Sequence, residues 1–140
     1  MTTALETKEL LSQLNAKSTD YASEFVATLL DAACKAQASD VHLQPCGNGL
    51  EIRWRLDGVL QVVGIFPSGE SADIVSRLKV LAELLTYHTD VPQEGRIREV
   101  NSGVEMRVST FPTLHGERAV VRLFPSDTEF KHLDDLGFSE

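Results

Sequence analysis

Two segments of the chain carry apolar residues at the spacing of an amphipathic helix. They read YASEFVATLLDAACKAQ, which begins at Tyr21, and ADIVSRLKVLAELL, which begins at Ala72. In both, apolar residues return every three or four positions, which places them on one face of a helix. Asp20 precedes the first segment and can cap it. We therefore predict helices near residues 20–37 and 71–85.

A shorter helical pattern, ALETKELLSQL, stands near the N-terminus. It is mostly polar and offers few apolar side chains for burial, and a helix of this length is marginal by itself. Chain termini are also the usual place for loose structure. We expect residues 1–19 to form a flexible N-terminal arm, with residues 1–15 poorly packed.

Elsewhere the pattern has a period of two, which is typical of strands with one buried face. The alternating runs are ASDVHLQP, LEIRWRL, VLQVVGIF, GRIREV, GVEMRVST and RAVVRLF. Asp57 and Gly58 separate the second run from the third and favour a tight hairpin turn, as residues 101–103 do between the fourth and fifth. Trp54 falls on an apolar face and is predicted to lie in the core. The segments PQEGR and FPTLHGE are expected to form loops.

Consecutive hairpins combined with two amphipathic helices predict an α+β domain. Its sheet would be mostly antiparallel, with the helices packed on one face, a PAS-like outline. Residues 20–126 would form this domain. The tail that follows, SDTEFKHLDDLGFSE, is acidic and shows no core pattern before LDDLGF. Residues 127–140 are therefore expected to be an exit linker.

Composition narrows the class of protein. The 140 residues carry a formal net charge of −8, and a sequence pI near 4.9 argues against duplex nucleic acid as the main partner. No apolar run is long enough for a membrane span, and the polar N-terminus does not resemble a secretory signal. Cys34 and Cys46 are the only cysteines. In a chain without a signal peptide they indicate a reduced, cytoplasmic protein.

The arginines are concentrated although the protein is acidic. All eight lie between Arg53 and Arg122, whereas acidic residues dominate both ends of the chain. This segregation suggests a local anion site on an acidic body, and the alternative is that these side chains are solvated on strand faces. Strand alternation places Arg53, Arg55, Arg107 and Arg122 away from the apolar core. The period alone does not decide whether all four share one face.

The other polar residues give little support for catalysis. None of the four histidines has the spacing of a metal site, so no metal is predicted. His115 and Glu117 could form an acid–base pair, but no nucleophile accompanies them, and turn chemistry explains both more simply. We predict no catalytic residue in this chain.

Read in order, six stretches resemble the second N-terminal domain of the ATPases of type II secretion and type IV pilus assembly. They are ASDVHLQP, IRWRLDGVL, SRLKVLAELL, VPQEGRI, MRVSTFPTLHGERAVVRLF and LDDLGF. Each is weak alone, but six in the correct order at plausible spacing are a strong signal. The similarity runs from about Tyr21 to Phe138, which is most of the chain.

The resemblance implies a role in a larger protein. Members of this family are cytoplasmic motors, usually hexameric, that hydrolyse ATP with Mg²⁺ and move pilin-like subunits through an inner-membrane platform. Their RecA-like ATPase domain would follow LDDLGF and needs a GxxxxGK[ST] loop to hold phosphates. None of the nine glycines here is followed by lysine. The chain alone is therefore expected not to be an enzyme and to hold no cofactor, whereas the parent protein would be an ATPase.

The same resemblance assigns roles to arginines. It implies that Arg107 in MRVST and Arg122 in VVRLF reach the phosphates of nucleotide bound by the RecA-like domain. Arg96 and Arg118 are possible additional contacts, and Arg118 could instead pair with Glu117 or with another surface acid. The implied partners are the RecA-like domain, neighbouring hexamer subunits and inner-membrane platform proteins, without nucleic acid or direct membrane insertion. The implied location is the cytoplasm, peripheral to the inner membrane through those partners.

A different class of function stays open at this point. Small domains with a PAS-like outline also act as stand-alone modules that bind a ligand or a partner protein without any coupling to ATP hydrolysis. A phosphate-binding loop encoded shortly after Glu140 would favour the motor domain over this alternative.

Overall fold

The computed structural model describes residues 2–67, 73–97 and 104–124. Its helices are α1 (Ala4–Ser12), α2 (Tyr21–Ala36) and α3 (Ile74–Leu81), and its strands are β1 (Asp40–Cys46), β2 (Gly49–Leu56), β3 (Val59–Phe66), β4 (Gln93–Ile97), β5 (Glu105–Thr113) and β6 (Gly116–Phe124). The strands form one sheet in the order β3-β2-β1-β6-β5-β4, and every neighbouring pair is antiparallel. The predicted α+β class with a mostly antiparallel sheet is confirmed.

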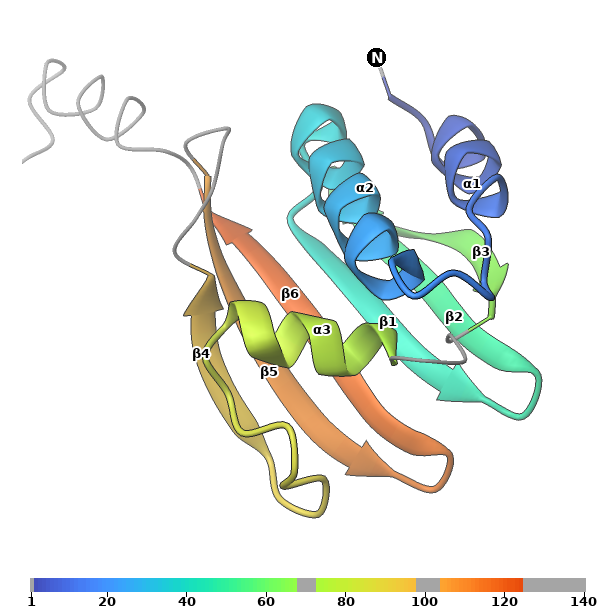
Figure 1. Ribbon diagram of the computed structural model, residues 1–140. Helices are drawn as coiled ribbons and strands as arrows, with labels where there is room; N and C mark the ends of the chain where they lie inside the picture. The colour runs from blue at the N-terminus through green and yellow to red at the C-terminus, as the bar shows by residue number, and fades with distance from the viewer. Residues whose placement is uncertain (1, 68–72, 98–103, 125–140) are drawn as a thin grey trace, which may run out of the picture.

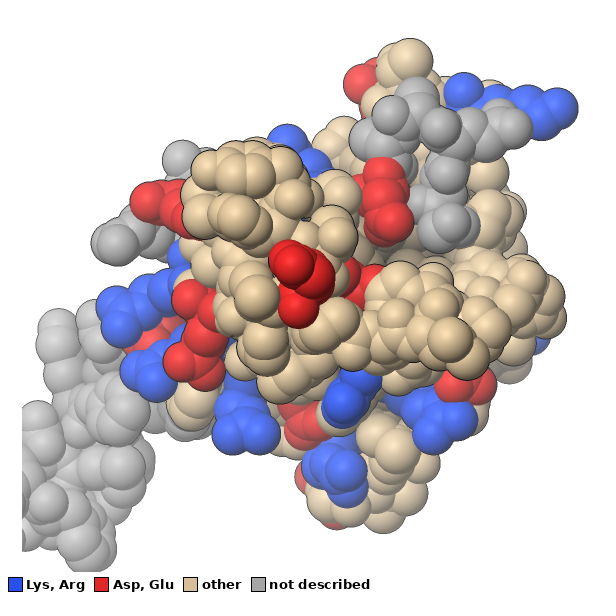
Figure 2. All heavy atoms as spheres, turned by 90° about the horizontal axis from the view of Figure 1, so that it is seen from below, with Lys and Arg blue, Asp and Glu red and all other residues tan. Residues whose placement is uncertain are grey.

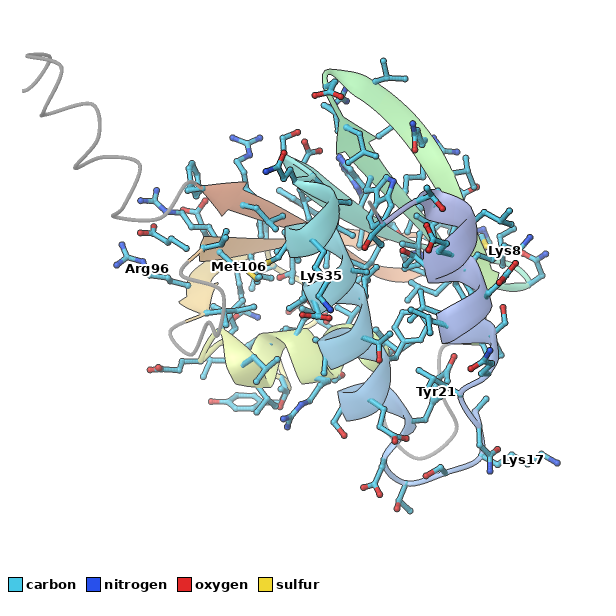
Figure 3. All side chains as sticks on the ribbon, turned by 90° about the horizontal axis from the view of Figure 1, so that it is seen from above. Lys8, Lys17, Tyr21, Lys35, Arg96 and Met106 are labelled. Carbon is cyan, nitrogen blue, oxygen red and sulfur yellow. The ribbon has the colours of Figure 1, made fainter. Side chains whose placement is uncertain are left out.

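All three helices lie on the same side of the sheet. α1 stands beside β3, α2 lies over the middle of the sheet, and α3 crosses β5 and β6 (Figure 1). In the described part of the chain, the opposite face of the sheet carries no helix (Figure 3). We call that uncovered side the open face.

The core lies between the sheet and the helices. The side chains that the strands contribute to the core follow the period-two alternation. Val41, Leu43, Ile52 and Trp54 are all fully buried, while the residues between them are only partly buried. The indole N–H of Trp54 donates to Gln61 Oε1 at 3.3 Å, which satisfies the one polar atom of the ring. The predicted core position of Trp54 is confirmed.

The two predicted helices form, but the second ends early. α2 spans Tyr21–Ala36, close to the predicted 20–37. α3 ends at Leu81, and the prediction that it continues to residue 85 is wrong. The reason is a reversal in which Glu83 takes a left-handed backbone conformation (φ 61°) and the N–H of Leu84 donates to the carbonyl of Lys79 at 2.7 Å. Residues 71 and 72 of the predicted start lie outside the described residues.

The hairpin between β2 and β3 forms as predicted. Asp57 and Gly58 both have positive φ, 50° and 80°, as a two-residue type I′ turn requires. Leu56 and Val59 form the pair that closes the turn. The turn predicted at residues 101–103 lies outside the described residues, although β4 and β5 on either side of it pair as a hairpin.

Two segments predicted to be loops are mostly strand. Residues of PQEGR form most of β4, and FPTLHGE is divided between β5 and β6, so that only Leu114 and His115 lie outside strands. Pro112 is tolerated in β5 because the pairing with β4 ends at Thr110. Beyond that point β5 has one free edge, where a residue without an N–H leaves no hydrogen bond unmade.

The N-terminal helix packs better than its sequence suggests. α1 contacts β3 and α2, Leu11 is 1% exposed and Thr7 is also buried. A capping box between Thr3 and Glu6 satisfies backbone donors at its start. The prediction of poor packing over residues 1–15 is therefore wrong for α1, because the sheet edge supplies the apolar surface that the helix needs. Residues 125–140, which include the predicted exit linker, lie outside the described residues.

Candidate functional site

The strand registers bring four arginines into one line across the open face. In the backbone register, Arg55 stands opposite Asp40, and Asp40 stands opposite Arg122. Arg122 in turn stands opposite Arg107, and Arg107 opposite Arg96. Directly opposite residues in antiparallel strands project from the same face. These five residues therefore form one row across β2, β1, β6, β5 and β4, which we call the arginine row.

Arg53 shares this face as well, because it lies two positions from Arg55 on β2. The question that the sequence left open is answered, since Arg53, Arg55, Arg107 and Arg122 all project from one side of the sheet. Figure 2 shows a concentration of Lys and Arg side chains along the lower side of the molecule, which is the open face, with acidic side chains among them, while other Lys and Arg side chains lie on the upper side.

The arginine row contains an unfavourable run of like charge. Arg122, Arg107 and Arg96 are consecutive cross-strand neighbours, and like charges in direct opposition are destabilising. Glu105 offsets part of this repulsion, because its Oε2 lies 3.0 Å from Arg107 Nε and 3.6 Å from Arg96 Nε. The Arg107 guanidinium also lies 5.0 Å from the centre of the Phe124 ring, which stabilises the cation.

Arg122 differs from its neighbours because its charge is not compensated. Its side chain is exposed, and among the described residues it makes no ion pair or hydrogen bond. Asp40, the acid opposite it, contacts other groups instead. Arg107 is held by Glu105 but its side chain is 51% exposed. A free guanidinium thus stands beside a second one that is accessible.

A hollow of about 330 Å³ opens beside these side chains on β5 and β6. Its lining combines three arginines, two phenylalanines and smaller polar and apolar groups: His42, Glu94, Arg107, Ser109, Phe111, Arg118, Val120, Arg122 and Phe124. The positive charges outnumber the single carboxylate, so the hollow favours an anion. Aromatic rings at its walls add apolar surface for the rest of a ligand.

Arg118 and Arg96 occupy different places relative to this hollow. Arg118 lines it, and its guanidinium lies 5.6 Å from the centre of the Phe111 ring. Arg96 is the next residue of the row beyond Arg107, but it is not in the lining. Figure 3 shows Arg96 at the sheet edge, pointing away from the helices, whereas Met106 on the other side of the sheet is buried. Three of the four predicted arginines are therefore brought together.

Sequence reasoning missed a buried ion pair beneath the hairpin of β5 and β6. Lys79 is fully buried, and its Nζ lies 2.9 Å from both carboxylate oxygens of Glu117, whose side chain is 9% exposed. Nζ also donates to the carbonyl of His88 at 2.8 Å. The suggested pairing of Arg118 with Glu117 is wrong, since Glu117 is committed to Lys79. An available signal was the position of Lys79, four residues after Val75 on the apolar face of α3.

His115 and Glu117 do not form an acid–base pair in the structure. His115 is exposed at the hairpin tip, whereas the Glu117 carboxylate points to Lys79. Both oxygens of the Glu117 carboxylate contact Lys79 Nζ, so the carboxylate is not directed toward His115.

Comparisons with known proteins identify the family of the chain. The family model described as type II/IV secretion system protein matches residues 15–140. The chain is 35% identical over 120 residues to the type IV pilus assembly ATPase PilB of Thermus thermophilus, which covers 84% of this chain and 14% of that protein. It is 41% identical over 119 residues to the type II secretion system ATPase E of Vibrio cholerae, covering 83% of this chain and 24% of the relative.

A third relative is the putative type II secretion system protein E of Escherichia coli, 36% identical over 129 residues, or 90% of this chain and 26% of that protein. The chain thus spans between 14% and 26% of the length of these relatives. Within the described ranges, the helices are all too short or too polar to cross a membrane. Since the family model covers nearly the whole sequence and the relatives align over most of it, the chain belongs to the type II/IV secretion system protein family.

Proposed function

We propose that this chain is the regulatory and mechanical N-terminal domain of an ATPase of type II secretion or type IV pilus assembly. In this role Arg107 and Arg122 contact the phosphates of nucleotide held by a RecA-like domain elsewhere in the longer protein. The observation that carries the proposal is the uncompensated charge of Arg122 directly opposite Arg107 on the open face.

The residue type and spacing suit a polyphosphate. A guanidinium carries a positive charge and presents a rigid fork of N–H donors to phosphate oxygens. Side chains in direct cross-strand opposition have Cβ atoms about 5 Å apart, so both forks can reach one phosphate chain. A bound anion would also relieve the repulsion within the arginine row, which adds to its affinity for this face.

The sheet explains how such a contact could be coupled to movement. Arg107 and Arg122 stand on neighbouring paired strands, so a rigid-body rotation of the domain would bring both to the nucleotide or withdraw both together. Bound ATP and Mg²⁺ supply the phosphoryl-transfer chemistry, and the residues described here fit phosphate oxygens. Arginines delivered in this way stabilise the charge that develops during that step.

The wider roles follow from the same assignment. The chain by itself would have no ATP turnover, because its sequence has no glycine followed by lysine and therefore no GxxxxGK[ST] loop. Its partners would be the RecA-like domain, neighbouring subunits of a ring and a platform at the inner membrane, on the cytoplasmic side. The coupled output would be the movement of pilin-like subunits.

Kinetics of the full-length parent protein test this proposal. Changing Arg122 or Arg107 to Ala should lower turnover by about 10²- to 10³-fold while nucleotide affinity falls by less than about tenfold, since comparable arginines matter most in the transition state. Arg→Lys should recover only part of the rate, because lysine lacks the planar fork.

The matched control is Arg53→Ala, which removes the same charge from the same face but from a side chain paired with Glu51 at 2.9 Å. Equal effects of Arg53→Ala and Arg122→Ala would contradict the assignment. Normal turnover in both the Arg107 and Arg122 variants would favour the alternative of a binding module without coupling to ATP hydrolysis.

A further inference from the structure

Asp40 stands directly opposite Arg122 in the strand register and yet forms no ion pair with it. The next cross-strand pair, Ser39 with Leu123, is joined by a backbone hydrogen bond, in which Leu123 N–H donates to the Ser39 carbonyl at 3.0 Å. Hydrogen-bonded and non-hydrogen-bonded pairs alternate in an antiparallel ladder, so Asp40 and Arg122 form a non-hydrogen-bonded pair, with Cα atoms only about 4.5 Å apart. An aspartate this close to an arginine would ordinarily form an ion pair with it.

Three other side chains contact the carboxylate oxygens of Asp40. Ser39 Oγ donates to Oδ1 at 2.8 Å, and Arg55 Nε lies 3.5 Å from the same oxygen. His42 Nε2 contacts the other oxygen, Oδ2. The Asp40 side chain is only 14% exposed, so the carboxylate has little freedom to turn toward Arg122 while these contacts last.

His42 is itself oriented by a second arginine. Its Nδ1 lies 3.5 Å from Arg118 Nη2. A carboxylate accepts but does not donate, so Nε2 is the donor in the contact with Asp40, and the tautomer with its proton on Nε2 leaves Nδ1 as an acceptor facing Arg118. Arg118, His42, Asp40 and Arg55 thus form one chain of contacts across β6, β1 and β2, which we call the Asp40 network.

We propose that the Asp40 network keeps Arg122 available for phosphate by holding the competing carboxylate away from it. Asp40, Arg55 and His42 are then positioning residues for phosphate recognition, although none of them touches the phosphate. The inference rests on the proposed function of Arg122 and adds to it the reason why an arginine opposite an aspartate stays uncompensated. If Arg55 were lost, Asp40 would compete with the phosphate for the same N–H donors.

Binding of inorganic tripolyphosphate to this chain tests the inference. The titration is followed by NMR of the backbone amides of β6 and of the arginine Nε–Hε groups, at constant ionic strength. Arg55→Gln should weaken binding about three- to fivefold, the range expected when a partly exposed ion pair competes for the site. Asp40→Asn should change the affinity little in the unmodified chain but restore most of the loss in the Arg55→Gln background.

Arg53→Gln is the matched control, because Arg53 lies on the same strand and face and pairs with Glu51 rather than Asp40. It removes the same charge, so equal weakening by Arg53→Gln and Arg55→Gln would overturn the inference. An Asp40→Asn effect of the same size in both backgrounds would overturn it too. Thermal unfolding of each variant checks that the fold is retained.

Arg122→Ala separates the two proposals. If it leaves tripolyphosphate binding unchanged, the phosphate site itself is wrong and the inference fails with it. If it abolishes binding while Arg55→Gln behaves like Arg53→Gln, only the role of the Asp40 network is wrong.

If the affinity for tripolyphosphate is too low to measure, the NMR signal of the Arg122 Nε–Hε group in the ligand-free chain tests the inference independently. In Arg55→Gln the Arg122 Nε–Hε signal should shift and exchange more slowly with water, because the side chain becomes ion-paired, and Asp40→Asn should reverse both changes. An Arg122 signal that stays unchanged in Arg55→Gln would contradict the inference.

Discussion

Lys79 shows how a single buried charge can organise several segments of a domain. Its ammonium joins the start of β6, through Glu117, to the loop after α3, through the carbonyl of His88. Taking an ammonium and a carboxylate out of water is unfavourable unless their hydrogen bonds are satisfied, and here the geometry satisfies them. The pair therefore fixes the β5–β6 hairpin, whose strands carry Arg107, Arg118 and Arg122.

Removing one partner of this pair should be severe. Lys79→Met is expected to lower the free energy of unfolding by about 3–5 kcal/mol, because Glu117 is left buried without a counter-ion. Replacing both residues, as Lys79→Met with Glu117→Leu, should recover much of the loss. Urea unfolding followed by circular dichroism measures both.

Lys35→Met is the control for the lysine, since Lys35 pairs with Asp31 at 3.0 Å on an exposed helix face. Its effect should stay below about 0.5 kcal/mol. Equal destabilisation by Lys79→Met and Lys35→Met would show that the buried pair does not have the role given to it here.

At the scale of elements, α1 extends the domain beyond the boundary that the sequence suggested. Leu11 is buried against the other elements, and α1 covers the edge strand β3 on the side of the helices. Edge strands are prone to pair with other chains unless something covers them. The packing of α1 therefore makes it part of the folded unit rather than a separate arm.

Substitution in α1 tests this packing. Leu11→Ala should lower the free energy of unfolding of the helix by about 2–5 kcal/mol, the usual range for truncating a buried leucine. Amide exchange in α1 should accelerate accordingly, with a smaller change in α2. Leu5→Ala is the matched control, because Leu5 is 65% exposed in the same helix. Fast exchange of α1 in the unmodified chain would contradict the packing.

At the scale of the whole molecule, local sequence patterns predicted most helices and strands but not the tertiary contacts between them. α2 and the β2–β3 hairpin depend on nearby residues, so the periods and the Asp57-Gly58 turn were sufficient. The arginine row depends on the pairing of β1 with β6, which joins Asp40 to Arg122 across most of the sequence. The contact between Lys79 and Glu117 likewise joins residues 38 positions apart, and no local pattern specifies it.

The same limit explains two of the wrong boundaries. The end of α3 depends on Glu83 adopting a left-handed conformation that glycine usually supplies, so the sequence carried no stop signal there. The strand at Pro112 depends on where β4 ends beside it. Resemblance to a family added a prediction that the periods could not make, because it singled out Arg107 and Arg122 among eight arginines, and that assignment stays a prediction.

The central claim is that Arg107 and Arg122 meet nucleotide phosphates in the parent protein. The most direct measurement is a structure of the full-length protein with a non-hydrolysable ATP analogue and Mg²⁺. The account predicts that, in at least one subunit, guanidinium nitrogens of both arginines lie within about 3.2 Å of phosphate oxygens, the reach of a hydrogen bond. A nucleotide-filled structure in which the open face points away from the phosphates in every subunit would contradict it.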